Sequence, residues 1–221
     1  MMRNELKNLT NFILPLSSCR QAPMKLSGKY VIQAEENKFG VLCEQTSFGG
    51  GWTVIQHRFD GSTDFYRNWT EYRNGFGNLD GEFWLGLEYV YQIMKNRPHE
   101  LIVELKDFEG TYKYARYREF GIGDESEAYA LKKLGKYAGT VGDSFAGNKG
   151  RKFSTYDRDH TLRKCAVKQH SGWWHDNCSN ANLNGRYEKK DGDMGSIIWI
   201  RFKGGNHGLA YSRMMIREII E

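Results

Sequence analysis

Four cysteines in two pairs of near neighbours constrain this chain more than any other feature. The pairs are Cys19 with Cys43 and Cys165 with Cys178. No CxxC motif and no histidine-rich spacing accompanies them, which disfavours a zinc or redox site. Four cysteines allow three connectivities, and pairing neighbours closes two short loops with the least demand on the fold. Two local disulfides, each contributing about 3 kcal/mol, are favoured over four reduced, buried cysteines in a cytosolic protein.

The composition favours a turn-rich β or α+β protein over a helical bundle. Aromatic residues make up 14% of the 221 residues, and 25 glycines accompany three prolines. A chain of this length buries roughly 70% of the surface that it exposes when unfolded, so its core needs no metal or partner.

The charge and hydropathy patterns exclude two classes of partner. The formal net charge is +5, and we interpret the basic residues as scattered over a surface of mixed charge. No recognition helix, zinc finger or RNA-binding signature supports a nucleic-acid partner. No apolar run has the length that a bilayer requires, so membrane insertion is not expected. The apolar stretch 12–16 is too short for the core of a signal peptide, which suggests a chain incomplete at its N-terminus.

The residue pattern predicts several elements and one long irregular region. Residues 28–44 are typical of a hairpin, 52–56 of a strand, and 87–95 of a short helix that ends before Pro98. Alternation over 101–108 and 112–120 predicts an antiparallel pair. After Gly150 the chain becomes rich in Asn, Asp, Gly and Trp. Long irregular segments in compact domains are commonly functional, so we expect the site there.

A series of short motifs runs in order from Cys19 to the C-terminus. Among them are Gly49-Gly50-Gly51-Trp52-Thr53-Val54, Gly81-Glu82-Phe83-Trp84-Leu85-Gly86, Gly172-Trp173-Trp174, Asn182-Leu183-Asn184-Gly185 and Met215-Ile216-Arg217. Together they resemble the fibrinogen C-terminal domain shared by fibrinogen, ficolins, tachylectins, angiopoietins and tenascins.

The resemblance implies an α+β fold over residues 19–221, preceded by an N-terminal extension of residues 1–18. The expected parts are a disulfide-tied N-terminal part, a central antiparallel sheet with short helices, and a loop-rich C-terminal part. The pairs Cys19–Cys43 and Cys165–Cys178 are implied as well. Relatives commonly sit behind a stalk that clusters several heads, and no stalk repeat is present here, although a homo-oligomer remains an expectation.

The segment from Tyr156 to Thr161 resembles the calcium loop of that family, so the expected cofactor is calcium. Calcium prefers six to eight oxygen ligands, and closely spaced Asp side chains supply them. The implied ligands are Asp157, Asp159 and Thr161, with Thr161 at a position that is usually acidic. Aligning from Phe153 selects Asp159 and Thr161, whereas aligning from Cys165 selects Asp157 and Asp159. The alternative is a solvated polar loop held by Arg158 or Arg163.

A second segment resembles the ligand pocket of the family. The implied ligand-binding residues are Trp173, Trp174, His175, Asn177, Cys178 and Tyr187, with aromatic walls suited to an acetyl methyl group or a sugar face. The family has a cis peptide before this cysteine, so Asn177–Cys178 is the expected cis bond. Ser179 and a shortened loop over 189–196 depart from the family pattern, and Lys168 with Gln169 disfavours a fibrin-type peptide.

These features lead to a function with one alternative. The main expectation is a secreted, innate-immune lectin that binds acetylated carbohydrate or microbial surfaces. The alternative is an angiopoietin-like or tenascin-like ligand for a protein receptor or matrix partner. No nucleophile elbow, HExxH motif or nucleotide loop is present, so no enzyme is expected. Sequons at Asn8, Asn68 and Asn177 are compatible with a secreted glycoprotein.

Overall fold

The computed structural model describes residues 15–220. Residues 1–14 of the predicted extension, with the Asn8 sequon, lie outside the described residues. One ten-stranded antiparallel sheet forms its centre, in the order β1-β2-β3-β12-β6-β7-β8, with β4, β5 and β9 off this path. A second, two-stranded sheet pairs β10 with β11. The strands are β1 (Gly28–Ala34), β2 (Asn37–Glu44), β3 (Trp52–Arg58), β4 (Phe76–Gly77), β5 (Phe83–Trp84), β6 (His99–Asp107), β7 (Tyr112–Ile122), β8 (Leu131–Leu134), β9 (Tyr137–Gly139), β10 (Ala181–Asn182), β11 (Ile198–Trp199) and β12 (Leu209–Glu218).

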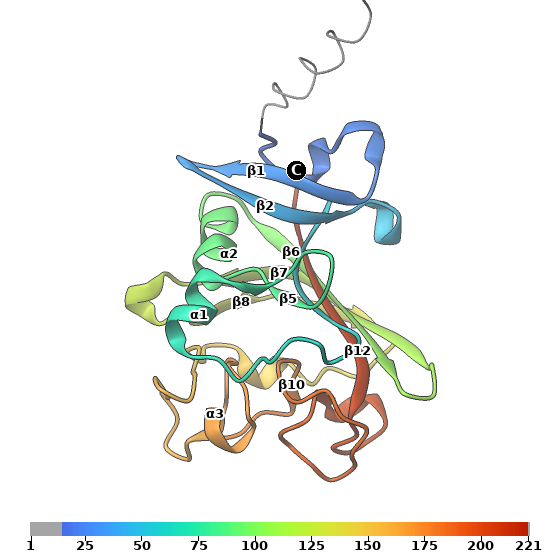
Figure 1. Ribbon diagram of the computed structural model, residues 1–221, viewed down its shortest axis with the longest axis vertical. Helices are drawn as coiled ribbons and strands as arrows, with labels where there is room; N and C mark the ends of the chain where they lie inside the picture. The colour runs from blue at the N-terminus through green and yellow to red at the C-terminus, as the bar shows by residue number, and fades with distance from the viewer. Residues whose placement is uncertain (1–14, 221) are drawn as a thin grey trace, which may run out of the picture.

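Three short α-helices accompany the sheet within residues 15–220. They are α1 (Trp69–Asn74), α2 (Leu87–Met94) and α3 (Cys165–Lys168). Figure 1 shows α1 and α2 on one side of the sheet, and α3 among the loops at the end opposite β1 and β2. The helix predicted over 87–95 is confirmed as α2, which buries Leu87, Val90 and Met94. No helix in residues 15–220 is long and apolar enough to cross a membrane.

The hairpin and the antiparallel pair are confirmed, and both predicted disulfides are present. β1 pairs with β2 and β6 pairs with β7, each antiparallel. Cys19 is bonded to Cys43, with a Cα–Cα distance of 5.4 Å. Cys165 is bonded to Cys178, with a Cα–Cα distance of 5.0 Å. The expected α+β architecture with a disulfide-tied N-terminal part is therefore correct.

The C-terminal strand β12 lies in the middle of the sheet, between β3 and β6. Its Met214, Met215 and Ile216 are fully buried. Arg213 reaches across neighbouring strands and pairs with Glu44 (3.0 Å) and Glu104 (2.6 Å). β12 thus joins strands β1, β2 and β3 to strands β6, β7 and β8. The irregular segment before β12 forms the end of the molecule opposite β1 and β2 (Figure 1).

Candidate recognition site

A cleft of about 500 Å³, here called the loop cleft, opens among three loops at the α3 end of the molecule. The turn before Phe153 supplies one wall, the segment before α3 a second, and the residues after Trp174 a third. Its lining comprises Gly150, Arg151, Lys152, His160, Thr161, Leu162, His175, Asp176 and Asn177. Of the predicted site residues, the cleft brings together Thr161, His175 and Asn177.

The Cys165–Cys178 disulfide fixes the two sides of the loop cleft to each other. It joins the first residue of α3 to the segment that carries His175 and Asn177. The prediction of a cis bond between Asn177 and Cys178 is wrong, because none of the described peptide bonds is cis. Cys178 instead takes a left-handed conformation, with φ of 68°, and the backbone turns there.

Trp173 and Trp174 do not line the loop cleft, and ligand binding by these two residues stays a prediction. Both indoles are fully buried. Trp173 packs on Phe145 at a ring-centroid distance of 5.4 Å, and Trp174 packs on Phe153 at 5.1 Å. The Trp174 indole N–H donates to the Tyr129 carbonyl oxygen (2.8 Å). Large aromatic rings bury more apolar area in a core than at a surface site, and here that burial decides their place.

Two histidines give the loop cleft neutral polar groups. Burial is the main cause that lowers the pKa of His175 to about 4, so the ring is neutral at physiological pH. Its Nε2 lies 3.4 Å from Ser171 Oγ, whereas its buried Nδ1 has no hydrogen-bond partner within the described residues. Burial likewise lowers the pKa of His160, whose Nδ1 lies 2.9 Å from the Phe153 carbonyl oxygen.

The predicted calcium ligands are engaged in other contacts. Asp157 Oδ1 accepts the Trp69 N–H (3.0 Å) and the Thr155 hydroxyl (2.7 Å). Asp159 accepts the Thr161 N–H and hydroxyl on Oδ1 and the Ala166 N–H on Oδ2. The Thr161 hydroxyl oxygen in turn accepts the Cys165 N–H (2.9 Å).

This arrangement does not fit a calcium shell. Three of the four carboxylate oxygens of Asp157 and Asp159 face N–H or O–H donors, and those donors occupy the positions that a cation would need. Asp159 acts as a cap for the first turn of α3, where a carboxylate satisfies free N–H groups. Calcium binding here stays a prediction, and it requires these donors to move away.

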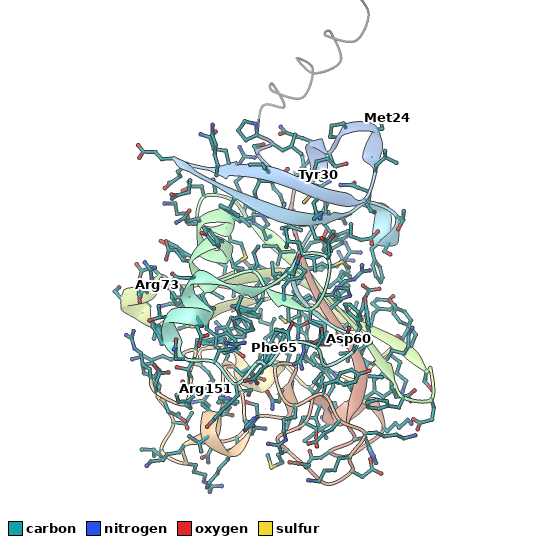
Figure 2. The ribbon with its side chains drawn as sticks, viewed as in Figure 1. Met24, Tyr30, Asp60, Phe65, Arg73 and Arg151 are labelled. Atoms are coloured by element: carbon teal, nitrogen blue, oxygen red, sulfur yellow. A yellow bond between two sulfur atoms is a disulfide. The ribbon has the colours of Figure 1, made fainter. Side chains whose placement is uncertain are left out.

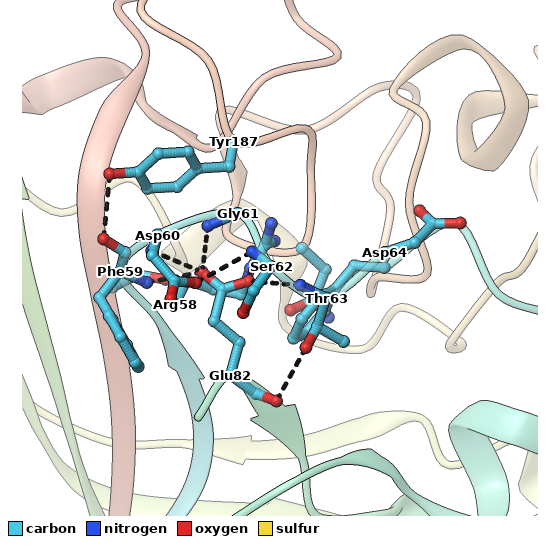
Figure 3. A network of polar contacts seen from close by, with 12 residues as sticks. Arg58, Phe59, Asp60, Gly61, Ser62, Thr63, Asp64, Glu82 and Tyr187 are labelled. Carbon is cyan, nitrogen blue, oxygen red and sulfur yellow. Dashed lines mark hydrogen bonds and ion pairs between the residues drawn. The ribbon is translucent and has the colours of Figure 1, made fainter. Parts of the chain in front are cut away.

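Tyr187, the remaining predicted residue, lines a different cleft. That cleft of about 390 Å³ is also lined by Tyr66, His170 and Arg186. The Tyr187 hydroxyl donates to the Phe59 carbonyl oxygen (3.0 Å), as Figure 3 shows. Its ring lies against Gly61, where φ is +74° and an added Cβ would come within 2.9 Å of the ring. Tyr187 thus contributes to packing here and does not reach the loop cleft.

Sequence reasoning missed a buried polar cluster that shapes the second cleft. The Glu82 carboxylate, fully buried, accepts the backbone N–H groups of Phe59 (2.7 Å), Asp60 and Gly61 (both 3.0 Å), as seen in Figure 3. The Arg58 guanidinium lies 3.4 Å from the same carboxylate. Only the motif around Glu82 pointed to this residue, and nothing in the pattern indicated that a loop folds around it.

The sequons differ in their surroundings. The Asn68 side chain caps α1 by accepting the Glu71 N–H (2.9 Å). Asn177 is exposed at the loop cleft, next to the disulfide-bonded Cys178. The Ser179 hydroxyl of that sequon is buried and accepts the Asn148 side-chain N–H (2.9 Å). Use of either sequon stays a prediction.

Comparisons with known proteins agree with this geometry. The family model "Fibrinogen beta and gamma chains, C-terminal globular domain" matches residues 17–219. Human angiopoietin-related protein 6 is 41% identical over 92% of this chain and 44% of its own length. Mouse tenascin-R is 40% identical over 88% of this chain and 14% of its own length. The chain thus spans less than half the length of these relatives.

A solved structure agrees as well. The fibrinogen-like globe domain of human ANGPTL6 superposes with a TM-score of 0.89 and 40% identity, over 95% of this chain and 98% of that one. The family match over nearly the whole chain, the sequence identity and the shared fold lead to one conclusion: this chain belongs to the fibrinogen C-terminal domain family.

Proposed function

We propose that this chain is an extracellular, non-enzymatic recognition domain that binds a protein, either a receptor or a matrix component. Its similarity to angiopoietin-related proteins and tenascin-R supports this function over that of a lectin. The two disulfides support an oxidising, extracellular compartment, because such bonds are rare in the cytosol.

The observation that carries the proposal is that the loop cleft lacks indole side chains, while exposed apolar side chains lie in and beside the segment that lines it. Trp173 and Trp174 are in the core, so the loop cleft has no indole wall for an acetyl group. Exposed apolar side chains lie in the neighbouring segment instead: Leu162 is fully exposed, and Val167 is 46% and Tyr156 40% exposed. Apolar side chains among polar ones are typical of a protein-binding surface.

Leu162 is the sharpest test of this surface. We expect labelled, oxidised protein to bind saturably to cells or matrix in a manner that protease treatment of the target abolishes. Leu162→Ser should weaken that binding by about tenfold, because truncating a central apolar contact costs on the order of 1–2 kcal/mol. The matched control is Leu26→Ser, since Leu26 is 55% exposed and lies just before β1, the strand at the end of the molecule opposite α3 (Figure 1). Equal effects of the two variants, or protease-resistant binding, would contradict the proposal.

The lectin function has its own discriminating measurement. Calorimetric titration with N-acetylglucosamine and with acetate, with and without calcium, tests it directly. We expect no saturable binding at millimolar ligand, because the polar loop cleft lacks an aromatic wall. Saturable binding that is lost in Asn177→Ala would reinstate the lectin and would displace the protein-binding proposal.

A further inference from the structure

One segment, residues 149–168, carries an excess of positive charge and is here called the basic segment. It holds seven Lys and Arg residues and two Asp residues, a net charge of +5 that equals the net charge of the whole chain. The rest of the sequence is therefore balanced. The seven are Lys149, Arg151, Lys152, Arg158, Arg163, Lys164 and Lys168, and all are exposed. The expectation of scattered basic residues is wrong for this segment.

The fold gathers both ends of the basic segment around the loop cleft. Arg151 and Lys152 line the cleft together with Leu162, which Arg163 and Lys164 follow directly. Lys168 lies one helical turn after Lys164, since its N–H donates to the Lys164 carbonyl oxygen (3.1 Å). The Cys165–Cys178 bridge holds this turn against the third wall of the cleft. Figure 2 shows Arg151 on the loop end of the molecule, opposite Met24.

Few acidic groups offset these cations locally. The carboxylates of Asp157 and Asp159 accept hydrogen bonds within their own loop. Arg151 pairs with Asp176 (2.9 Å), and Arg158 lies 3.9 Å from Glu125. Lys152, Arg163, Lys164 and Lys168 form no ion pair within the described residues. Elsewhere on the surface most basic side chains have an acidic partner, as Lys29 has Asp80 and Lys133 has Glu119.

We propose that the basic segment binds a sulfated polysaccharide. Unpaired cations on one exposed surface attract a polyanion, because binding releases its counterions. Sulfate esters stay ionised at every physiological pH and are abundant outside the cell, where disulfide-bonded proteins reside. The exposed apolar residues between the cations are Tyr156, Leu162 and Val167. Two of them are aliphatic, and the Tyr156 ring already packs against Tyr66 at a ring-centroid distance of 4.8 Å, so the segment offers bases little aromatic surface for stacking. These properties favour a sulfated chain over a nucleic acid.

The test compares two triple variants of equal charge. Lys152→Glu, Arg163→Glu and Lys168→Glu reverse three cations of the basic segment and avoid Lys164, whose φ is 53°. Lys38→Glu, Arg118→Glu and Lys136→Glu reverse three exposed cations outside the basic segment, which form no ion pair within residues 15–220 and have no positive φ. The probe is a heparin-derived dodecasaccharide, and its affinity is measured by calorimetry or surface plasmon resonance at several NaCl concentrations.

We expect the first triple variant to bind at least tenfold more weakly than the unmodified protein, with a shallower dependence of log K on log salt. The second triple variant should stay within about twofold. Equal losses in both variants would overturn the proposal, since they would report net charge alone. So would the absence of binding at 50 mM NaCl, or tighter binding of a single-stranded oligonucleotide of equal charge.

Two controls separate this proposal from the proposed function. Thermal unfolding of the oxidised variants checks that each has folded. Leu162→Ser should leave dodecasaccharide affinity within about twofold, because it changes no charge. If the unmodified protein shows no protease-sensitive binding but still binds the dodecasaccharide, the receptor or matrix function alone is refuted. If it shows protease-sensitive binding but does not bind the dodecasaccharide, the polysaccharide site alone is refuted.

Discussion

The sheet and the loop end of this molecule are ordered by different means. In the sheet, backbone ladders satisfy the polar groups, as in the nine paired positions between β12 and β6. In residues 140–208, here called the loop region, the strands are short. Buried side-chain amides form hydrogen bonds with the backbone groups there. Asn148 donates to the Trp174 carbonyl oxygen (2.6 Å), Asn184 to that of Gly172 (2.9 Å), and Asn182 to that of Gln169 (2.8 Å).

Gln169 shows how one such side chain can replace a ladder. It is fully buried, its amide nitrogen donates to the Ser179 carbonyl oxygen (3.1 Å), and its oxygen accepts the Ser179 N–H (2.9 Å). A buried backbone group without a partner costs as much as a lost hydrogen bond. Irregular backbone can therefore be buried where amide side chains supply the hydrogen bonds that a neighbouring strand would otherwise make. The outer surface of the loop region then stays free for recognition.

The largest expected effect comes from Glu82, which directly precedes β5 and whose buried carboxylate accepts backbone N–H groups, as the side-chain amides do in the loop region. Glu82→Ala should lower the free energy of unfolding by about 3–5 kcal/mol, because Arg58 loses its buried partner and several N–H groups lose their acceptor. Urea denaturation measures this loss.

Two further variants make the Glu82 result interpretable. Glu82→Gln keeps the shape and an acceptor oxygen, so it should lose less stability and should still fold. Glu119→Ala, which removes a pair with Lys133 between half-exposed groups, should cost less than about 1 kcal/mol. A Glu82→Ala loss no larger than the Glu119→Ala loss would show that the loop over residues 59–63 does not depend on this carboxylate.

Gln169→Ala tests the amide replacement itself. We expect a loss of about 2 kcal/mol in the free energy of unfolding, because both backbone groups of Ser179 become unpaired. Amide hydrogen exchange should accelerate near residue 179 and stay slow in β6. Gln92→Ala on α2, whose amide bonds to Asn37 and Glu88 on the surface, should change stability by about 0.5 kcal/mol or less. Uniform acceleration across both regions would contradict a division of the molecule into two differently held parts.

The smallest effect concerns pH and lies in the sheet. Burial opposes ionisation of Glu44, but hydrogen bonds from Thr46 and Ser47 and the charge of Arg213 outweigh it and lower its pKa to about 2. A lowered folded-state pKa stabilises the protein above the unfolded value near 4.5, and that contribution disappears as the pH falls towards 2.

Glu44→Gln should therefore reduce the loss of stability between pH 4.5 and pH 2 by about 1 kcal/mol, with solvent screening included. The measurement is the thermal midpoint as a function of pH. Glu36→Gln, at an exposed hairpin residue, should follow the unmodified protein. An unchanged pH dependence in Glu44→Gln would assign acid sensitivity to other carboxylates, including those of the loop region.

Much of the fold was predictable because its signals are local. Alternation over 101–108 indicated a strand, which is β6, although β6 is buried on both faces apart from Lys106. The spacing of Leu87, Val90 and Met94 indicated a helix. Sequence proximity favoured the correct disulfide pairs. The central place of β12 was not predictable, because it depends on pairing with β3 and β6, which lie far away in the sequence.

The candidate site was less predictable for the same reason. The sequence by itself determined the family motifs, the irregular region after Gly150 and the +5 charge of residues 149–168. Only the tertiary structure decided that Trp173 and Trp174 face the core, that Asp159 caps α3, and that two parts of the basic segment line the loop cleft. Residue type states what a side chain can do, whereas burial and hydrogen-bond partners depend on contacts between distant segments, which no local pattern encodes.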